Sequence, residues 1–279
     1  RNAGKYTIGT TVSKGEVVNF EYYHANYTGG PLQIAVAVIN NTGKPVAFKV
    51  SREGKATGNV TTTSTINIAA KCNAAFYNSS ARWDTINNQQ TFLLASSGPL
   101  NDKEMANGKV EISPIDGSLS VRIIFYDPNK TTQTSAASFD RATDDGKLRT
   151  TAMFKYNHRS ISLNLANNQN KSFLLFPANA IPNWKTLNKG EYPQSHLDAI
   201  AGVDGIGTQQ MNDAGTVILD TRWLVIGNYG IIYDLKLSGC NGRKIQFSKA
   251  TNNAGTIMTR VNNGTWYAKA LPFTYDAST

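Results

Sequence analysis

Short runs of alternating apolar and polar residues recur along the whole chain, and this pattern constrains the fold more than any other feature. Side chains on a β-strand point alternately to its two faces, so each run predicts a strand with one buried face. Gly, Asn, Pro and Asp bound most of the runs. We predict strands at residues 6–12, 17–24, 32–39, 46–50, 59–68, 91–95, 109–113, 118–126, 150–156, 160–165, 172–176, 216–224, 229–237, 244–248, 256–261 and 265–270.

Strands at this spacing predict an all-β fold and argue against alternating strand–helix units. The chain has 279 residues, enough for one large β-sandwich or two packed sandwiches of the immunoglobulin-like or jelly-roll-like kind. Residues 1–145 and 146–279 form two halves of one domain or two domains. Short helices are expected at 68–77 and 195–201, and residues 177–215 read as a long loop or a linker.

Residues 32–50 form the clearest local pattern. Two alternating apolar runs flank the connection Asn40-Asn41-Thr42-Gly43-Lys44-Pro45. This arrangement predicts a β-hairpin with a loop of several residues. The sequence contains no repeat of fixed period.

Composition points to an extracellular protein at the cell surface. Charged residues make up only 17% of the chain, below the usual quarter, and Asn, Ser, Thr and Gly take their place. The sequence begins at Arg1, which indicates either a processed N-terminus behind a removed signal peptide or a cloning boundary. No apolar run is long enough to span a membrane.

The net charge of +9 is spread over scattered Lys and Arg residues. Nucleic-acid binders concentrate such residues into patches, so nucleic acid is not an expected partner. A mildly basic surface fits cell-wall phosphate or acidic polysaccharide better.

The sequence allows two kinds of covalent modification, a disulfide and N-glycosylation. Cys72 and Cys240 form one disulfide, as expected for an even cysteine count outside the cell, or they are two unrelated buried thiols. Glycosylation sequons, at about the number that chance gives in so Asn-rich a chain, occur at Asn26, Asn40, Asn59, Asn78, Asn129, Asn170 and Asn263.

Sequence motifs for catalysis are missing, so we expect no enzyme and no cofactor. The three histidines have no metal-ligand spacing, and there is no nucleophile elbow. Acidic residues gather in Gly-rich loops, where they usually form turns. An extracellular hydrolase built on two of these carboxylates is the third alternative for function.

Tryptophans in polar loops are candidates for stacking on sugar rings. Trp83 and Trp184 lie in such loops, whereas Trp223 lies in an apolar run that is typical of a core. A loop Trp more often docks on its own domain, so both interpretations stay open.

The N-terminal strand carries the most specific expectation. Tyr6, Ile8 and Val12 lie on one face of the predicted strand. A strand so close to a chain end pairs either with its own subunit or with a neighbour, as in donor-strand complementation.

Several segments resemble a pattern in bacterial, especially Firmicute, surface proteins. They are Phe20-Glu21-Tyr22-Tyr23-His24-Ala25-Asn26-Tyr27-Thr28-Gly29, then 32–36 and 40–43, and later Gly227-Asn228-Tyr229-Gly230-Ile231-Ile232-Tyr233. Such proteins often follow copper-amine-oxidase-like stalk domains. The resemblance implies a secreted, envelope-associated β module. It carries over no catalytic residues, and nothing here matches a copper or quinone site.

These observations together predict a structural subunit of a cell-surface assembly, such as a filament, pilus-like fibre or coat. Its expected partners are copies of itself in a homopolymer. The alternative is a cell-wall or glycan-binding module.

Overall fold

The computed structural model describes residues 4–142, 153–154, 158–166, 210–211, 232–247, 256–270 and 273–276. It confirms an all-β, sandwich-type fold with few helices. The chain divides into two compact units, residues 1–142 with 247–273 and residues 143–246 with 274–279. The division at 142 falls close to the predicted boundary at 145. Residues 247–273 belong to the first unit as well.

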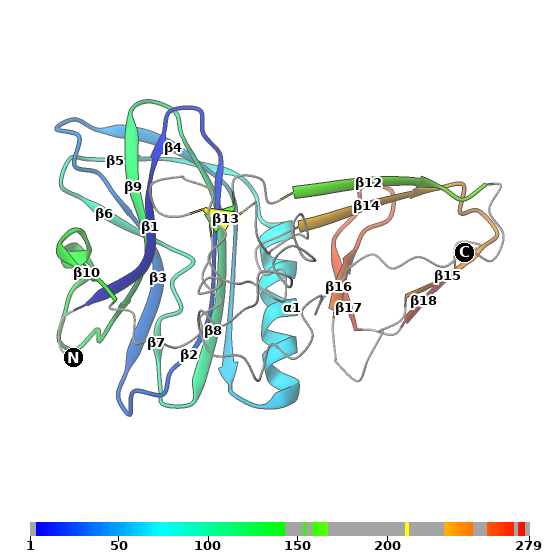
Figure 1. The fold of residues 1–279 in the computed structure, drawn as a ribbon, viewed down its shortest axis with the longest axis horizontal. Helices are drawn as coiled ribbons and strands as arrows, with labels where there is room; N and C mark the ends of the chain where they lie inside the picture. Colours follow the sequence, from blue (N-terminus) through cyan, green and yellow to red (C-terminus); the bar gives the residue numbers. More distant parts are fainter. Residues whose placement is uncertain are drawn as a thin grey trace, which may run out of the picture. The chain divides into compact units, whose positions relative to one another are not determined.

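One face of the first unit is a six-stranded sheet in the order β10-β1-β9-β3-β6, with β7 also paired to β3 (Figure 1). All of its pairings are antiparallel except the short parallel one between β1 and β10. Its strands are β1 (Lys5–Ser13), β3 (Leu32–Ile39), β6 (Thr91–Leu94), β7 (Pro99–Leu100), β9 (Ser118–Tyr126) and β10 (Asp140–Arg141).

The facing sheet has four antiparallel strands in the order β2-β8-β4-β5. Apolar side chains of the two sheets meet between them, and Val36, Phe48 and Val121 there have no exposed surface. This interdigitated layer is the main core, as the alternating runs predict. The strands are β2 (Val18–Ala25), β4 (Val46–Asn59), β5 (Arg82–Ile86) and β8 (Glu104–Pro114).

The predicted hairpin at residues 32–50 is wrong. β3 lies in the six-stranded sheet and β4 in the four-stranded sheet, so their connection crosses the sandwich instead of returning beside β3. Both strands bury their apolar face in the same core. Two strands with inward apolar faces look alike whether they are neighbours in one sheet or face each other across two.

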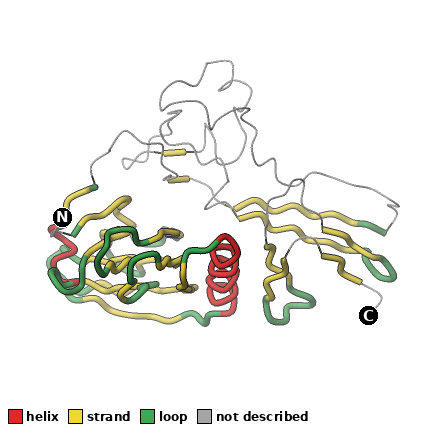
Figure 2. Tube along the Cα trace, turned by 90° about the horizontal axis from the view of Figure 1, so that it is seen from below, coloured by secondary structure: helices red, strands yellow, loops and turns green. Residues whose placement is uncertain are grey.

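The predicted strand at 59–68 is also wrong beyond its first residue, because helix α1 runs from Thr62 to Asn78. Threonine and isoleucine at its start favour strands. Helical spacing of Ile68, Cys72 and Phe76 nevertheless places all three on one buried side. This side packs on β4 and β8, so the helix forms a third layer outside the four-stranded sheet (Figure 2).

Two corner turns of the sandwich share one hydrogen-bond pattern, in spite of the absence of a fixed-period repeat. In the turn after β2, the Asn26 amide donates to the Gly30 and Leu100 carbonyls at 2.7 and 2.9 Å, and its Oδ1 accepts from the Thr28 N–H and hydroxyl at 3.0 and 2.8 Å. In the turn after β3, Asn40 makes the equivalent bonds.

The bonds of the second corner match the first almost distance for distance. The Asn40 amide donates to the Lys44 and Ile86 carbonyls at 2.7 and 2.8 Å, and Oδ1 accepts from the Thr42 N–H and hydroxyl at 3.0 and 2.8 Å. Gly43, like Gly29 of the first corner, has a positive φ, which glycine adopts without strain. The motif Asn-x-Thr-Gly therefore makes both of these corners, the β2–β3 and the β3–β4 connection, where the chain passes from one sheet to the other.

A second, smaller core lies on the outer side of the six-stranded sheet. Ala136 of the short helix η1 (Gln133–Ser138) and Phe139 cover Ile39, Ile124 and neighbours there. The Arg122 guanidinium donates to the carbonyls of Ala136 at 3.2 Å and Ala137 at 2.9 Å, which fixes the helix on the sheet.

Two more strands belong to the first unit, β16 (Thr256–Thr259) and β17 (Tyr267–Ala270), and they pair antiparallel. The Asn78 side chain at the end of α1 bonds to both the N–H and the carbonyl of Trp266, each at 3.0 Å. The Trp266 ring also contacts the Tyr77 ring. The 256–270 hairpin is thus attached to the helix.

The strands described outside these layers form pairs. β11 (Met153–Phe154) pairs with β13 (Gln210–Met211), and β12 (His158–Asn164) pairs in parallel with β14 (Ile232–Ser238). β15 (Lys244–Phe247) pairs with β18 (Phe273–Asp276). The predicted strands at 172–176 and 216–224 and the predicted helix at 195–201 lie outside the described residues.

Candidate functional site

The N-terminal strand β1 is paired within its own chain. It runs antiparallel to β9 from Lys5 to Ser13. On its other side, among the described residues, β10 pairs only with Lys5 and Tyr6. From Ile8 to Ser13, β1 is therefore an edge strand of the described sheet.

The side chains of β1 do not share one face as predicted. A β-bulge between Tyr6 and Ile8 shifts the register against β9. Ile8 and Val12 reach the main core, whereas Tyr6 lies on the outer core under the Arg122 guanidinium, 4.7 Å from the ring centroid. The extra residue of a β-bulge reverses which face of the sheet the following side chains occupy, and the sequence pattern does not reveal it.

Trp83 lies on the outer side of the four-stranded sheet and is 64% exposed. It belongs to the edge strand β5 and lies opposite Lys49 of β4, whose ammonium is 5.4 Å from the ring centroid. An exposed indole with a cation near one face can still present its other face to a ligand. Trp184, the other predicted stacking residue, lies outside the described residues.

A partly buried polar group, which we call the Lys109 cluster, lies between α1 and the four-stranded sheet. It comprises Glu21, Cys72, Asn73 and Lys109. The Lys109 ammonium donates to Asn73 Oδ1 at 3.1 Å and lies 3.2 Å from the Glu21 carboxylate. Lys109 is only 8% exposed, which is rare for a lysine.

Strand register and one glycine build this cluster. Lys109 of β8 has Glu21 of β2 directly opposite on one side and Gly54 of β4 on the other. A Cβ at Gly54 would lie 2.4 Å from the Cys72 carbonyl and from the Phe76 nitrogen. The missing side chain therefore lets the helix backbone approach the sheet closely and brings Asn73 to Lys109.

Electrostatics in the cluster favour the charged lysine. Burial lowers the pKa of Lys109, but the Glu21 carboxylate, with smaller contributions from Tyr77 and Cys72, outweighs this effect and raises the pKa above its ordinary value. The Phe76 ring, with its centroid 5.5 Å from Nζ, closes the apolar side. Sequence reasoning missed this cluster, because a lysine in an alternating strand usually marks the solvent side.

Both cysteines, for which the sequence leaves a disulfide and two separate thiols open, are free thiols in the structure. Cys72 has no exposed surface and donates its thiol to the Gly54 carbonyl at 3.5 Å. Burial, with a smaller contribution from Glu21, raises the pKa of Cys72 to about 12. Its sulfur is thus a packing element of α1.

The predicted glycosylation sites differ widely in environment. The Asn26 and Asn40 side chains are fully buried and bonded in the two corners, so the folded chain leaves them no room for a glycan. Asn78 is bonded to Trp266. Asn59, Asn129 and Asn263 are exposed, and Asn170 lies outside the described residues.

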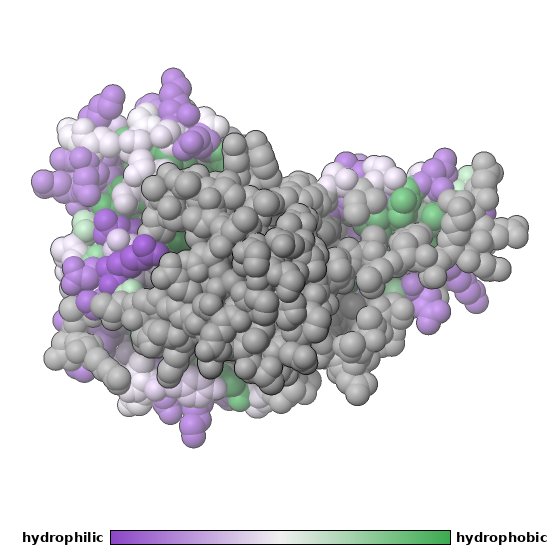
Figure 3. Space-filling model, in the orientation of Figure 1, coloured by the Kyte–Doolittle hydropathy of each residue, from purple (hydrophilic) through white to green (hydrophobic). Residues whose placement is uncertain are grey.

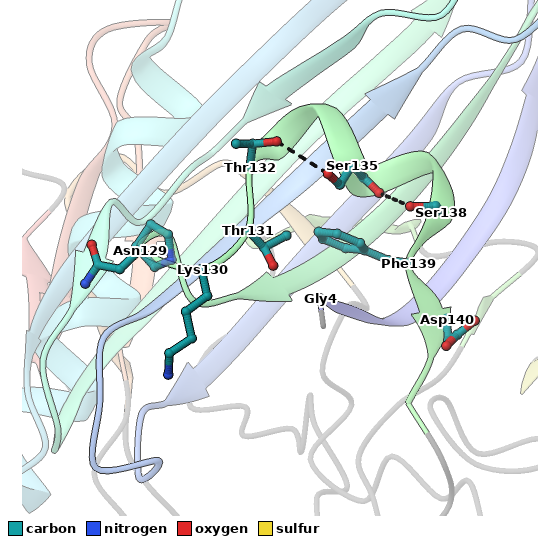
Figure 4. Close-up of a pocket in the computed structure, with 10 residues that line it drawn as sticks. Gly4, Asn129, Lys130, Thr131, Thr132, Ser135, Ser138, Phe139 and Asp140 are labelled. Carbon is teal, nitrogen blue, oxygen red and sulfur yellow. Dashed lines mark hydrogen bonds between the residues drawn. The ribbon is translucent and has the colours of Figure 1, made fainter. Parts of the chain in front are cut away.

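A shallow pocket of about 480 Å³ opens beside the N-terminal end of β1. Figure 4 shows hydroxyl side chains around it, with Ser138 donating to the Ser135 carbonyl at 2.8 Å. Its charged residues already have partners, since Lys130 pairs with Asp127 and Asp140 with Lys5. The pocket holds no arrangement of a base and a nucleophile.

The rest of the described surface is mixed. In Figure 3 its visible part is largely hydrophilic or neutral, with small apolar areas. Among the described residues, no group of His, Cys, Asp and Glu is placed to hold a metal ion. No helix there is both long and apolar enough to cross a membrane.

The fold and these surfaces define an all-β sandwich with a helix on one sheet and an edge strand at its N-terminal end. The sequence matches no protein-family model, and neither a curated protein nor a solved structure is similar to it.

Proposed function

We propose that the chain is a non-catalytic structural subunit of an extracellular cell-surface assembly, joined to its neighbours through exchange of strand β1. The observation that carries this proposal is the place of β1. It contributes Ile8 and Val12 to the main core, and one edge from Ile8 onward has no partner strand among the described residues.

A strand in this place is suited to exchange. β1 is followed by the short connection of residues 14–17 before β2, and it contacts the sandwich mainly through β9. The same eight register positions on β9 accept β1 from the same chain or from a second copy. A subunit that completes its own sheet thereby becomes a link in a chain of subunits when β1 moves to a neighbour.

Deletion of Arg1–Val12 tests this proposal. We expect the full chain to form multimers visible by electron microscopy, and the shortened chain to lose them because the acceptor edge of β9 has no strand to receive. Thr11→Ala changes an exposed residue of β1 and serves as the control that retains multimers. Normal multimers of the shortened chain would overturn strand exchange.

Trp83 favours a second candidate, a cell-wall or glycan-binding module. Its indole is open to solvent and has a cation beside it. Aromatic faces of this kind stack on sugar rings, and the net charge of +9 adds attraction to anionic polysaccharide.

Pull-down on peptidoglycan and on anionic polysaccharides tests this second function. We expect Trp83→Ala to lose binding and Tyr27→Ala, which removes a ring that is 66% exposed elsewhere on the unit, to retain it. Equal binding by both variants would show that Trp83 is not the site.

A further inference from the structure

The Lys109 cluster has the composition and the contacts of a reaction centre rather than of a simple ion pair. A primary amine, a carboxamide and a carboxylate meet between α1 and the sheet. Lys109 Nζ is 3.1 Å from Asn73 Oδ1 and 3.2 Å from Glu21 Oε2. The carboxamide carbon of Asn73 is one bond away from the oxygen that Nζ already contacts.

We propose that Lys109 and Asn73 form an intramolecular isopeptide bond, with Glu21 as the proton carrier. This inference goes beyond the proposed function and does not depend on it. It assigns a covalent bond between a residue of β8 and a residue of α1, and a role in proton transfer to a residue of β2.

The chemistry balances within the three residues. Glu21 takes a proton from the Lys109 ammonium, which leaves a neutral amine. The amine nitrogen attacks the Asn73 carboxamide carbon and forms a tetrahedral intermediate. Glu21 then carries its own proton and one proton of the attacking nitrogen to the amide nitrogen, which leaves as ammonium. One C–N bond forms and one breaks, no oxidant or reductant is needed, and the carboxylate of Glu21 is regenerated.

The surroundings shield the reacting amine from water. Lys109 is 8% exposed, and Cys72 and Phe76 beside it have no exposed surface. Separated charges cost most in such a place. Lys109 rests as an ammonium beside Glu21, so the reaction passes through the minor state in which the proton has moved to the carboxylate, and the product amide carries no charge.

Positioning supplies the rest. Nζ is held on a central strand of the four-stranded sheet, and Asn73 is held on a helix whose backbone touches that sheet at Gly54. Reacting groups fixed at contact distance react as if at very high concentration, because no freedom remains to be lost. Glu21, opposite Lys109 in the register, is in place to move the proton.

The mass of the full chain under denaturing conditions tests the proposal without any variant. We expect a mass lower than that of the sequence by one ammonia. Digestion with trypsin should give a branched peptide in which residues 72–82 are joined to residues 104–122, uncut at Lys109. A chain of full mass, or one without the branched peptide, would overturn the proposal, even if ammonia had been lost at another asparagine.

Variants identify the three roles. Asn73→Asp should still cross-link, now with loss of water, and should give the same branched mass. Glu21→Gln keeps the size of the side chain and should leave most of the chain uncross-linked. Lys55→Arg, at a lysine of β4 that bonds to the Ser96 carbonyl, is the matched control and should cross-link fully. Because all masses are measured on unfolded single chains, the result is independent of whether the subunits assemble.

Discussion

At the scale of single residues, the corner asparagines have the most definite energetics. Asn40 is fully buried, and its side chain satisfies two carbonyls, one N–H and one hydroxyl. Asn40→Ala leaves these groups without partners inside the protein. We expect a loss of about 1–3 kcal/mol of unfolding free energy, measured by urea denaturation.

The neighbour Asn41 offers the control for this change, because it is exposed and Asn41→Ala should shift stability by less than about 0.5 kcal/mol. Since the corner at Asn26 has the same bonds, Asn26→Ala should resemble Asn40→Ala. A large difference between the two would mean that the corners, though alike in geometry, are not alike in energy.

Gly54 sets the distance between α1 and its sheet. Gly54→Ala would place a methyl group 2.4 Å from two backbone atoms of the helix, which neither a rotamer nor a flexible side chain can relieve. We expect a loss of about 1–3 kcal/mol, the usual range for overpacking, again by urea denaturation. Gly30→Ala, with nothing within 4 Å, should be close to neutral.

At the scale of elements, α1 controls the reactivity of Cys72. A pKa of about 12 and full burial keep this sulfur protonated and shielded. In the folded chain, a thiol reagent at a pH of about 8 should modify Cys240 but leave Cys72 unreacted. Both should react in denaturant, and rapid native labelling of Cys72, located by peptide mapping, would mean that the helix opens readily.

The raised pKa of Cys72 makes the folded state less stable as the pH rises. An unfolded thiol has a pKa of about 8.5, below the folded value of about 12. Between these values the unfolded chain loses a proton that the folded chain keeps, so stability falls as the pH rises. Below this window Cys72 adds no pH dependence. Cys72→Ala should flatten this part of the curve in denaturation series at increasing pH.

Sequence patterns predict elements better than they predict connections. The alternating runs at 32–39 and 118–126 coincide with β3 and β9. The same alternation does not reveal the bulge at Tyr6, the sheet to which β4 belongs or the helix that starts at Thr62, because these depend on tertiary packing. The sequence did not predict the burial of Lys109 either, because that face of β8 is buried only by the packing of α1.

At the scale of the whole molecule, exchange of β1 competes with its pairing inside the chain. To move, β1 must give up its register with β9 from Lys5 to Ser13 and withdraw Ile8 and Val12 from the core. Exchange between folded subunits should therefore be slow. Refolding from denaturant removes this barrier, because β1 and β9 are both unpaired when they meet.

The share of multimers should then depend on the concentration during refolding. We expect mainly monomers after refolding at low concentration and mainly multimers at high concentration, measured by size-exclusion chromatography with light scattering. Dilution of the folded multimers should not reverse them within hours.

An excess of a peptide with residues 5–13, added during refolding, should pair with β9 and reduce the share of multimers. The same peptide with Val12→Asp should not, because a carboxylate cannot enter the core. If the multimer share were independent of concentration and peptide, self-pairing of β1 would be permanent and another surface would have to join the subunits.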